Sequence, residues 1–278
     1  MPTTDEARFA FGENWQRFLA VLNDDRVAAA ETSLRSMLHR TSLEHTTFLD
    51  VGSGSGLFSL AARRLGASVR SFDYDPQSVA CTAELRRRYF ADDDRWTVEQ
   101  GSVLDTDYLA TLGRFDVVYS WGVLHHTGAM WQALANVAPL VAPGGQLFIA
   151  LYNDQGAASA RWHRIKRRYA SGGKVTQEAL VGLVGAYFAT RMVVTRTLNA
   201  ASGTTREVHR RDDVDRRGMS RWYDLRDWVG GFPFEVAKPD DVVAFYLDRG
   251  FELTRLKTVG GQLGCNEYVF AAPPISGV

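Results

Sequence analysis

The sequence has few cysteines and no excess of charge of either sign. Its 278 residues include two cysteines, Cys81 and Cys265, which lie far apart and outside any spacing typical of a metal site. This usage suits a reducing compartment and does not predict a disulfide. Basic and acidic residues number 32 each, so the formal net charge is zero. No global field therefore draws the protein to nucleic acid, and we expect no nucleic-acid partner, although a local patch could still bind one.

Long hydrophobic runs are also missing. The longest apolar stretch, residues 179–190, ends at Arg191 and is shorter than a membrane-spanning helix requires. Residues 1–6 carry neither the basic region nor the apolar core of a signal peptide. We therefore expect a cytoplasmic protein with no membrane span. The stretch 179–190 leaves three interpretations open, namely a homodimer contact, a lid helix and a surface for a lipid-like substrate.

Short β-rich runs alternate with helical runs from residue 47 onward, which is typical of βαβ units and a parallel sheet. Strands are predicted at residues 48–51, 68–72, 96–99, 115–119, 146–151, 251–256 and 268–271. The last two are joined by a glycine-containing hairpin, so the closing strand should run antiparallel. The predicted fold is α/β, a Rossmann-like seven-stranded and mostly parallel sheet with an antiparallel last strand, helices on both faces and a helical lid insertion.

The segment between the fifth and sixth strands is too long for a simple crossover. We predict an N-terminal helical flap at residues 1–45, a sheet domain at 46–152 and 238–275, and a substrate lid at 153–237. Residues 161–169 form a basic helix, either a solvated face or a site for phosphate, carboxylate or nucleic acid.

The composition of the lid predicts which part of it contacts the substrate. Residues 217–235 are rich in glycine and aromatics and show no clear period. We interpret them as an irregular segment that lines the substrate pocket together with residues 261–267. Trp222 and Arg226 are its candidate substrate-binding residues.

A glycine-rich turn follows the first predicted strand. Residues 48–56 read FLDVGSGSG, so the strand ends in closely spaced glycines and opens into a helix whose N-terminal N–H groups are free. Such a turn alone is weak evidence for any particular nucleotide-type ligand, because dinucleotide-binding enzymes use a related turn. Asp73 strengthens it, since it ends the second strand at the distance where a carboxylate meets the two ribose hydroxyls. The alternative is helix capping before Pro76, a role that we assign to Asp75.

These segments together resemble a known family. Residues 48–56 are similar to motif I of class I S-adenosylmethionine-dependent methyltransferases, and Asp73 matches the ribose-binding acid of that family. The segments GSVLD (101–105), FDVVYS (115–120), VLHH (123–126) and PGG (143–145) resemble its later elements. The resemblance covers residues 46–152 and the last two strands. Within the family, the sequence resembles a small-molecule, methyltransferase-domain group that is similar to the ubiquinone-type methylases.

The resemblance implies an enzyme with S-adenosylmethionine as its cofactor and a small-molecule acceptor, methylated most simply on oxygen. An RNA-modifying enzyme acting on tRNA and a non-catalytic cofactor-binding protein are the alternatives. The cofactor contacts are assigned to Trp15 in the flap and to Asp50, Gly52, Ser53, Gly54, Asp73, Tyr74, Ser102, Val103, Ser120 and Trp121. Asp50 would orient the turn and approach the amino group. An acid often stands at the position of Ser102, and Trp121 has core packing as its alternative role.

Three residues are candidates for catalysis. His125 and His126 follow the fourth strand, where a base could serve an oxygen acceptor or a histidine could act as a structural hydrogen-bonding residue. Tyr152 follows the fifth strand and is expected in the acceptor pocket with Asn153, for which helix capping is the alternative. No metal site is predicted, since two adjacent histidines do not make one.

Overall fold

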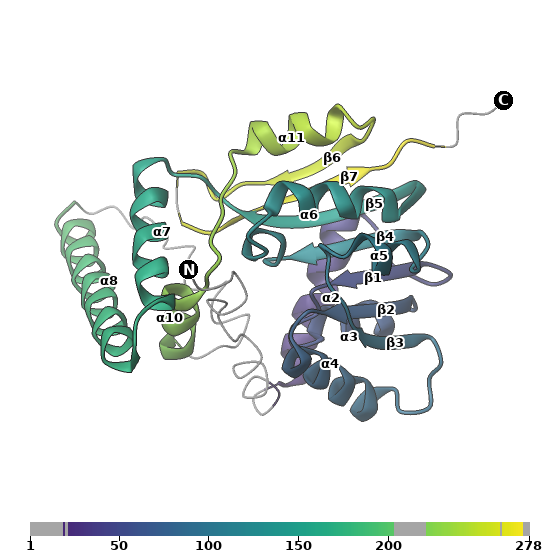
Figure 1. Cartoon of the computed structure of the whole chain (residues 1–278), viewed down its shortest axis with the longest axis horizontal. Helices are drawn as coiled ribbons and strands as arrows, with labels where there is room; N and C mark the ends of the chain where they lie inside the picture. Colours follow the sequence, from purple (N-terminus) through teal and green to yellow (C-terminus); the bar gives the residue numbers. More distant parts are fainter. Residues whose placement is uncertain (1–18, 20–21, 203–220, 262, 275–278) are drawn as a thin grey trace. The chain divides into compact units, whose positions relative to one another are not determined.

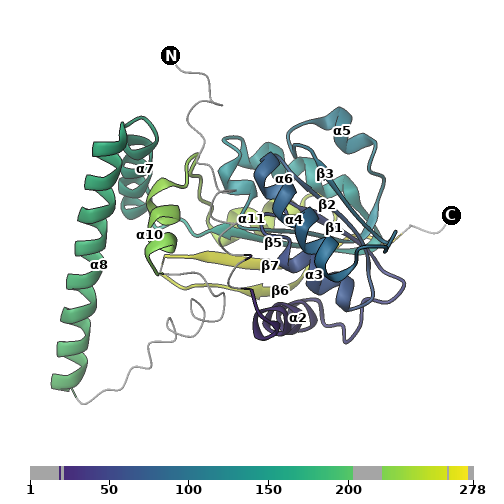
Figure 2. The same ribbon diagram turned by 90° about the horizontal axis from the view of Figure 1, so that it is seen from below.

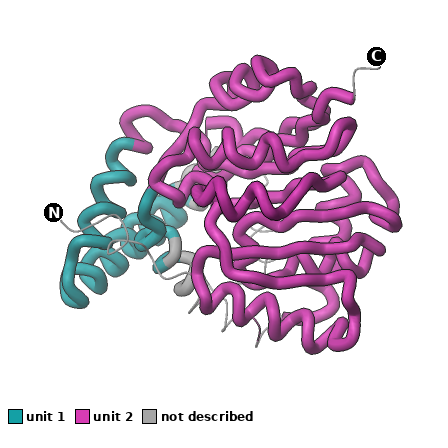
Figure 3. The backbone as a smooth tube through the Cα atoms, turned by 45° about the vertical axis from the view of Figure 1, so that its right-hand side comes forward, with its two compact units in different colours: residues 1–9, 160–233 teal, residues 10–159, 234–278 magenta. Residues whose placement is uncertain are grey.

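The computed structural model describes residue 19 and residues 22–202, 221–261 and 263–274 (Figure 1). The chain divides into two compact units, coloured separately in Figure 3. One unit draws on residues 10–159 and 234–278 and contains the sheet. The other draws on residues 160–233 and is helical in its described part. The division falls at 159/160 and 233/234.

Seven strands form a single sheet in the first unit, in the order β3-β2-β1-β4-β5-β7-β6. Their bounds are β1 (Thr47–Val51), β2 (Ser68–Asp73), β3 (Trp96–Gln100), β4 (Phe115–Trp121), β5 (Val141–Tyr152), β6 (Glu252–Lys257) and β7 (Cys265–Ala271). The pairs β1–β2, β1–β4, β2–β3 and β4–β5 are parallel, whereas β7 is antiparallel to both β5 and β6. The predicted sheet and its antiparallel closing strand are confirmed.

Helices cover both faces of this sheet, as predicted. Their bounds are α2 (Asp24–Leu38), α3 (Leu57–Arg64), α4 (Pro76–Tyr89), α5 (Thr106–Ala110), α6 (Met130–Val137) and α11 (Pro239–Leu247), with short 3₁₀ turns η1 (Leu124–His126) and η2 (Ala138–Leu140). Buried residues of α2, α3 and α4 share one apolar cluster with strand residues such as Phe48 and Phe148. Those of α5, α6 and α11 share the other with neighbours such as Leu49 and Ile149. Successive strand residues therefore point to opposite cores, as the pleat requires.

Strand β5 begins earlier than its predicted start at residue 146. Phe115 pairs with Val141, the register then shifts, and Val117 pairs with Gln146. The PGG segment at 143–145 therefore lies within β5 as an irregularity and does not form a separate turn before it. A Cβ on Gly145 would come 2.8 Å from the carbonyl oxygen of Ala142 and 2.9 Å from that of Asp116. Only glycine allows the two strands to approach this closely.

In its described part the second unit consists of three helices, α7 (Ala157–Ala170), α8 (Lys174–Ser202) and α10 (Arg221–Gly230) (Figures 1 and 2). Trp162 of α7 stacks on Phe188 of α8 at 5.9 Å between ring centroids and meets the edge of Trp228 of α10 at 5.6 Å. The Nζ of Lys166 is fully buried, donates to the carbonyl oxygen of Trp228 and lies 4.5 Å from the centroid of its ring. An aromatic centre with one satisfied lysine thus holds this unit together.

Helix α10 corrects the expectation for residues 217–235. Those residues were predicted to be irregular, but residues 221–230 are helical. Val229 is fully buried, and Leu225, four residues before it, lies against Gly185 of α8. Glycines on either side obscured this short i, i+4 pattern, and packing against α8 decides the conformation.

None of the helices in the described parts of the chain combines the length and the hydropathy that crossing a membrane requires. Cys81 lies on α4 and Cys265 opens β7, and the two do not form a disulfide.

Replacement of Tyr246 by phenylalanine tests the packing of α11 on α6. The fully buried hydroxyl of Tyr246 donates to the carbonyl oxygen of Leu134 at 3.1 Å. Tyr246→Phe removes this donor and leaves a buried acceptor unsatisfied, so the free energy of unfolding in urea should fall by about 1–2 kcal/mol. The half-exposed Tyr187 provides the control, because Tyr187→Phe should change stability by no more than about 0.5 kcal/mol. Equal effects of the two variants would contradict this account.

Candidate active site

The strand order reverses its direction beside β1. From β1 the chain builds outward through β2 to β3, and it then returns to add β4 on the other side of β1. Helices α3 and α4 lie on one face, whereas α5 and α6 lie on the other. At such a reversal the connections leave in opposite directions and open a binding site at the carboxyl ends of the strands. The predicted cofactor residues after β1, β2 and β4 all lie at this edge.

The glycine turn after β1 is tight on both sides. The N–H groups of Gly52 and Ser53 both donate to the carbonyl oxygen of Phe72, at 2.9 and 3.1 Å. Gly52 has φ of 79°, and a Cβ there would lie 2.4 Å from Cγ1 of Val123. Gly54 and Gly56 also have positive φ, at 54° and 79°. Glycine is therefore required by conformation, and at Gly52 also by the loop after β4.

Asp73 is joined to this turn by its carboxylate. One carboxylate oxygen accepts the N–H of Gly54 at 2.9 Å, and the other accepts the N–H of Asp75 at 2.9 Å. Burial raises the pKa of Asp73 to about 6, although the backbone hydrogen bonds oppose the rise. A carboxylate has about four lone-pair positions, so each oxygen can still accept a hydroxyl. Asp75 accepts the N–H of Gln77 at 2.9 Å and caps α4, which confirms its predicted role.

Asp50 lies beneath the turn and is only 2% exposed. Its carboxylate accepts the hydroxyl of Ser59 on α3 at 2.5 Å, and the Ser59 and Ser71 hydroxyls are 2.7 Å apart. The indole N–H of Trp96 donates to Ser71 at 2.9 Å. Burial raises the pKa of Asp50 to about 7, and the nearby Asp73 adds to the rise while Ser59 opposes it. The turn therefore rests on a buried carboxyl group fixed to three strands and a helix.

Two of the three predicted cofactor serines, Ser53 and Ser120, use their hydroxyls for hydrogen bonds within the protein. Ser53 Oγ lies 2.9 Å from Oγ1 of Thr82, which is also 3.3 Å from the carbonyl oxygen of Gly54. Ser120 is fully buried, and its hydroxyl donates to the carbonyl oxygen of Val51 at 2.9 Å. These side chains hold the backbone of the turn, so a ligand above it would meet backbone atoms.

The segment expected to contact adenine follows β3. The Ser102 hydroxyl accepts the N–H of Leu104 at 3.2 Å, and Asp105 caps α5 by accepting the N–H of Tyr108 at 3.0 Å. Val103 is buried, and its carbonyl oxygen accepts the side-chain amide of Asn136 at 2.8 Å.

Two further aromatic candidates lie at this edge. Tyr74, directly after Asp73, is 46% exposed. Trp121 ends β4, is partly buried and packs against the cluster that contains α3 and α4. An exposed ring at Tyr74 is available to a ligand, whereas the contacts of Trp121 fit its alternative role in core packing as well.

The two histidines differ in burial. His125 is fully buried, and its Nδ1 accepts the N–H of Tyr152 at 3.4 Å while its carbonyl oxygen accepts the N–H of Glu235 at 3.0 Å. A ring nitrogen that accepts a backbone N–H carries no proton, so this contact favours the neutral imidazole. His126 is only partly buried, and its ring meets the edge of the Tyr152 ring at 5.4 Å. The arrangement favours a structural role for His125 and leaves His126 and Tyr152 at the site.

Asn153 is bound to the hairpin of β6 and β7. Its side-chain amide donates to the carbonyl oxygen of Gly260 at 2.9 Å, and its side-chain oxygen accepts from the fully buried Asn266 at 3.0 Å. Asn266 in turn accepts the N–H of Val259 at 3.0 Å. These bonds orient the hairpin toward the end of β5, and they occupy the groups that were predicted to bind substrate.

Sequence reasoning missed Glu235. Its carboxylate accepts the N–H of Met130 at the start of α6, and its backbone N–H bonds to His125. Burial raises the pKa of Glu235, against the effect of bonds from the N–H groups of Met130 and Gly128. The carboxylate thus stabilises a helix N-terminus more than a hundred residues earlier in the chain, and no local pattern signals this.

The other predicted site residues divide between the two units. Trp15 lies outside the described residues, as does the side chain of Trp222. Arg226 of α10 forms an ion pair with Glu178 of α8, so both partners belong to the helical unit. Across the described residues, no three side chains of His, Cys, Asp or Glu gather as ligands for a metal ion.

Comparison with known proteins agrees with this geometry. Residues 49–147 match the family model described as a methyltransferase domain. This region is therefore a methyltransferase domain, in agreement with the resemblance to class I S-adenosylmethionine-dependent methyltransferases. The matched region contains the glycine turn, Asp73 and both histidines. The methyltransferase domain is therefore an enzyme domain.

The names of individual relatives refer to different substrates. Ubiquinone biosynthesis O-methyltransferase of Parvibaculum lavamentivorans is 34% identical over 116 residues, which are 40% of this chain and 42% of the relative. tRNA U34 carboxymethyltransferase of Methylococcus capsulatus is 34% identical over 111 residues, 40% of this chain and 33% of the relative. The matches thus span less than half of the relatives' lengths. The magnesium protoporphyrin IX methyltransferase of Synechocystis PCC 6803 with bound SAH shares the fold, with TM-score 0.55, 13% identity and 97% of each chain covered.

The raised pKa of Asp50 predicts that the free energy of unfolding depends on pH. That pKa is about 7 in the folded protein and 3.8 in a model peptide, so the folded state binds the proton more tightly. Stability is therefore lost as pH rises from about 4 to 7, by about 4 kcal/mol for this group alone. Asp50→Asn keeps an acceptor for Ser59 and removes this loss. The stability difference between variant and wild type should shift by a few kcal/mol in favour of the variant between pH 4 and pH 8.

The measurement is urea unfolding at both pH values, with Asp107→Asn as the exposed control on α5. A difference that stays constant with pH would show that Asp50 ionises in the folded protein as it does in the unfolded chain.

Proposed function

We propose that this chain binds S-adenosylmethionine at the glycine turn and transfers the methyl group to a small-molecule acceptor, most simply at oxygen. The carboxylate of Asp73 is the observation that carries the proposal. It lies at the end of β2, where one oxygen accepts the N–H of Gly54 and the other that of Asp75, both at 2.9 Å. The backbone of Tyr74 adds a third hydrogen bond, and the roughly four lone-pair positions of a carboxylate still leave accepting capacity. This arrangement suits two vicinal hydroxyl donors, as in a ribose. The match to a methyltransferase domain over residues 49–147 supports the choice of nucleoside.

The remaining donor contacts follow from the same edge of the sheet. Tyr74 and the backbone at Ser102 and Val103 would contact adenine, and the backbone of residues 52–54 would lie under the methionine part. Asp50 would act through the turn, because its carboxyl group is nearly inaccessible beneath it. A positive ligand above two acids with raised pKa would be stabilised by both. Trp121 would offer an aromatic ring near the sulfonium.

The donor supplies an electrophilic methyl group, and the protein aligns the acceptor with it and excludes water. The acceptor oxygen forms the new bond to carbon with a lone pair, while the carbon–sulfur bond breaks and its electrons stay on sulfur. The hydroxyl proton of the acceptor passes to a base. We assign that base to His126, whose ring is partly exposed, and we assign to Tyr152 the orientation of the acceptor. His125 is excluded from the proton transfer by its burial and by its bond to the N–H of Tyr152.

Two observations support a small-molecule acceptor. Ubiquinone biosynthesis O-methyltransferase is a relative named for a small-molecule pathway, and the formal charge of this chain is zero. A relative named for tRNA and the arginines of α7 favour RNA as the competing acceptor. Retention of the wild-type protein on RNA at low salt, with methyl transfer to it, would favour that alternative.

Replacement of Asp73 tests the donor site. Asp73→Ala should weaken S-adenosylmethionine binding at least tenfold in calorimetry at pH 8, because the ribose hydroxyls lose a charged acceptor. Affinity of the wild type should fall as pH drops through about 6, since protonation removes the carboxylate. Asp116→Ala serves as the control, because Asp116 binds Thr47 at the opposite edge of the sheet.

A comparison of ligands separates direct binding from damage to the turn. 5′-Methylthioadenosine and its 2′,3′-dideoxy form should bind the Asp73 variant with nearly equal affinity, whereas the wild type should prefer the first. If the variant retains the full preference for the hydroxyl-bearing ligand, Asp73 is not the ribose ligand.

Replacement of His126 tests the base. His126→Gln should lower kcat about 100-fold or more with an oxygen acceptor and leave the affinity for S-adenosylmethionine and the Tm unchanged. A group that only stabilises the loop would instead lower the Tm with little effect on kcat. His125→Gln provides that contrast, because its ring is buried against Tyr152.

A further inference from the structure

Helix α8 has an apolar face that nothing in the described part of the helical unit covers. Val181 and Val184 are buried on its inner side, toward Trp162 and α10. On the opposite side Val175 is 85% exposed, Leu183 68% and Val193 60%. Surface helices normally carry charge on their outer side, whereas residues 179–190 carry none. Exposed aliphatic side chains that share one face mark a binding surface more often than single ones do.

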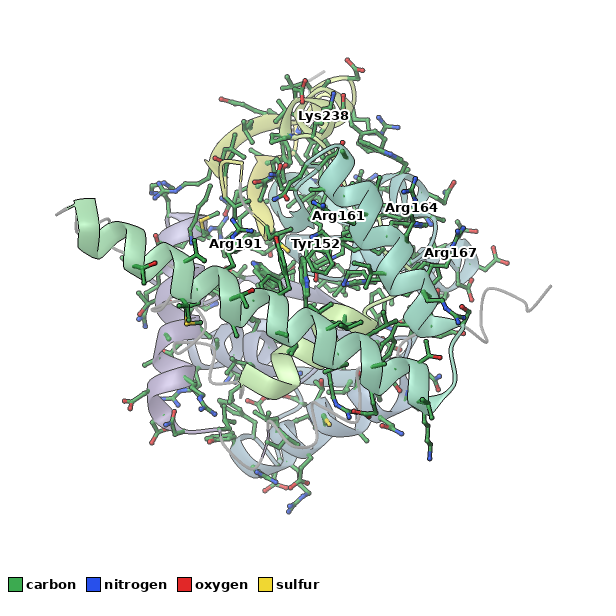
Figure 4. The ribbon with its side chains drawn as sticks, turned by 90° about the vertical axis from the view of Figure 1, so that its left-hand side faces the viewer. Tyr152, Arg161, Arg164, Arg167, Arg191 and Lys238 are labelled. Atoms are coloured by element: carbon green, nitrogen blue, oxygen red, sulfur yellow. The ribbon has the colours of Figure 1, made fainter. Side chains whose placement is uncertain are left out.

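Helix α7 adds positive charge beside this face. Its exposed side chains include Arg161, Arg164, Arg167 and Arg168, which recur at helical spacing. None of the four forms an ion pair with any described residue. Figure 4 shows the first three along α7, on the side of the unit where α8 also faces the viewer. Between residues 160 and 194 the chain has seven basic residues and one acidic residue, Glu178, which is paired with Arg226.

Of RNA, a second copy of the chain and an anionic lipid surface, the lipid surface matches both features. RNA would match the arginines and leave the aliphatic face without a counterpart. A second copy of the chain would cover the aliphatic face, but a symmetric contact through these helices would bring like-charged arginine rows toward each other. An anionic lipid surface offers phosphates to guanidinium groups and acyl chains to valine and leucine. Long arginine side chains can also reach headgroups while the helix lies lower in the interface.

We propose that α7 and α8 form a surface that binds anionic membranes, with Leu183 and Val193 in the acyl boundary and Arg161, Arg164 and Arg167 on lipid phosphates. The helix lies in the plane of the interface. The proposal does not depend on methyl transfer, since all of its residues belong to the helical unit. Under this proposal the apolar stretch 179–190 faces lipid and is not a dimer contact.

Flotation of the full-length protein with vesicles tests this surface. Wild-type protein should float with equal parts of phosphatidylcholine and phosphatidylglycerol, should remain unbound with phosphatidylcholine alone, and should dissociate when salt is raised. The double variant Arg164→Ala/Arg167→Ala should lower the partition coefficient about 25-fold, because each basic residue near such a surface contributes about a fivefold factor. Leu183→Asp/Val193→Asp should abolish flotation.

Matched controls lie in the sheet unit. Arg114→Ala/Lys238→Ala removes the same charge from exposed positions there, and Leu256→Asp replaces an exposed aliphatic residue that is 42% accessible. Both should float as the wild type does, and every variant should keep its Tm and its affinity for S-adenosylmethionine.

Three results would overturn the proposal. Equal flotation with and without phosphatidylglycerol would remove the role of the arginines. Absence of flotation together with a dimer that Leu183→Asp dissociates in sedimentation equilibrium would assign the face to a second copy. Absence of flotation together with RNA binding that only the arginine variant weakens would assign it to nucleic acid.

Discussion

The carboxylate of Asp73 joins the parts of the sheet on which the proposed donor site depends. It receives the N–H of Gly54 from the turn after β1 and the N–H of Asp75 from the start of α4, both at 2.9 Å. Without it, two backbone donors in a water-poor environment would have no partner. The same bonds hold the carboxylate in one position, so the contact that closes the turn also orients the proposed ribose ligand.

The glycine turn is constrained from the opposite side by the loop after β4. Val123 would collide with a side chain at residue 52, so the first strand and the segment containing the histidines fit together only with glycine there. The turn after β1 and the loop after β4 are thereby held in close contact. Glu235 fixes the far end of the same segment through His125 and the N-terminus of α6. The proposed base thus lies between two anchors, neither of which is adjacent to it in sequence.

Local pattern was enough to predict the strands, the antiparallel closing strand, Asp75 as a cap and the glycine turn, because each depends on neighbours in sequence or on alternation along one strand. Local pattern could not predict which side chains are buried or which hydrogen bonds join distant elements. Nothing near His125 shows that its ring is the buried one, and nothing near Asn153 signals Asn266 on β7. The helix at 221–230 was missed for the same reason, since its packing partners belong to α8. These features arise from contacts between distant segments, which a single sequence does not display.

Two buried acids beneath one turn have a consequence for ligand charge. Asp50 and Asp73 each have a pKa that burial raises; the charge of Asp73 adds to the rise at Asp50, and the charge of Asp75 adds to the rise at Asp73. In the free protein, ionisation of these two carboxyl groups therefore lowers the free energy of unfolding as pH rises toward neutral. A ligand with a sulfonium and an ammonium group would lower both pKa values by favouring the charged forms. A neutral nucleoside would gain only the hydroxyl contacts, so this pair of acids favours the charged methyl donor over its uncharged relatives before any contact with the acceptor is made.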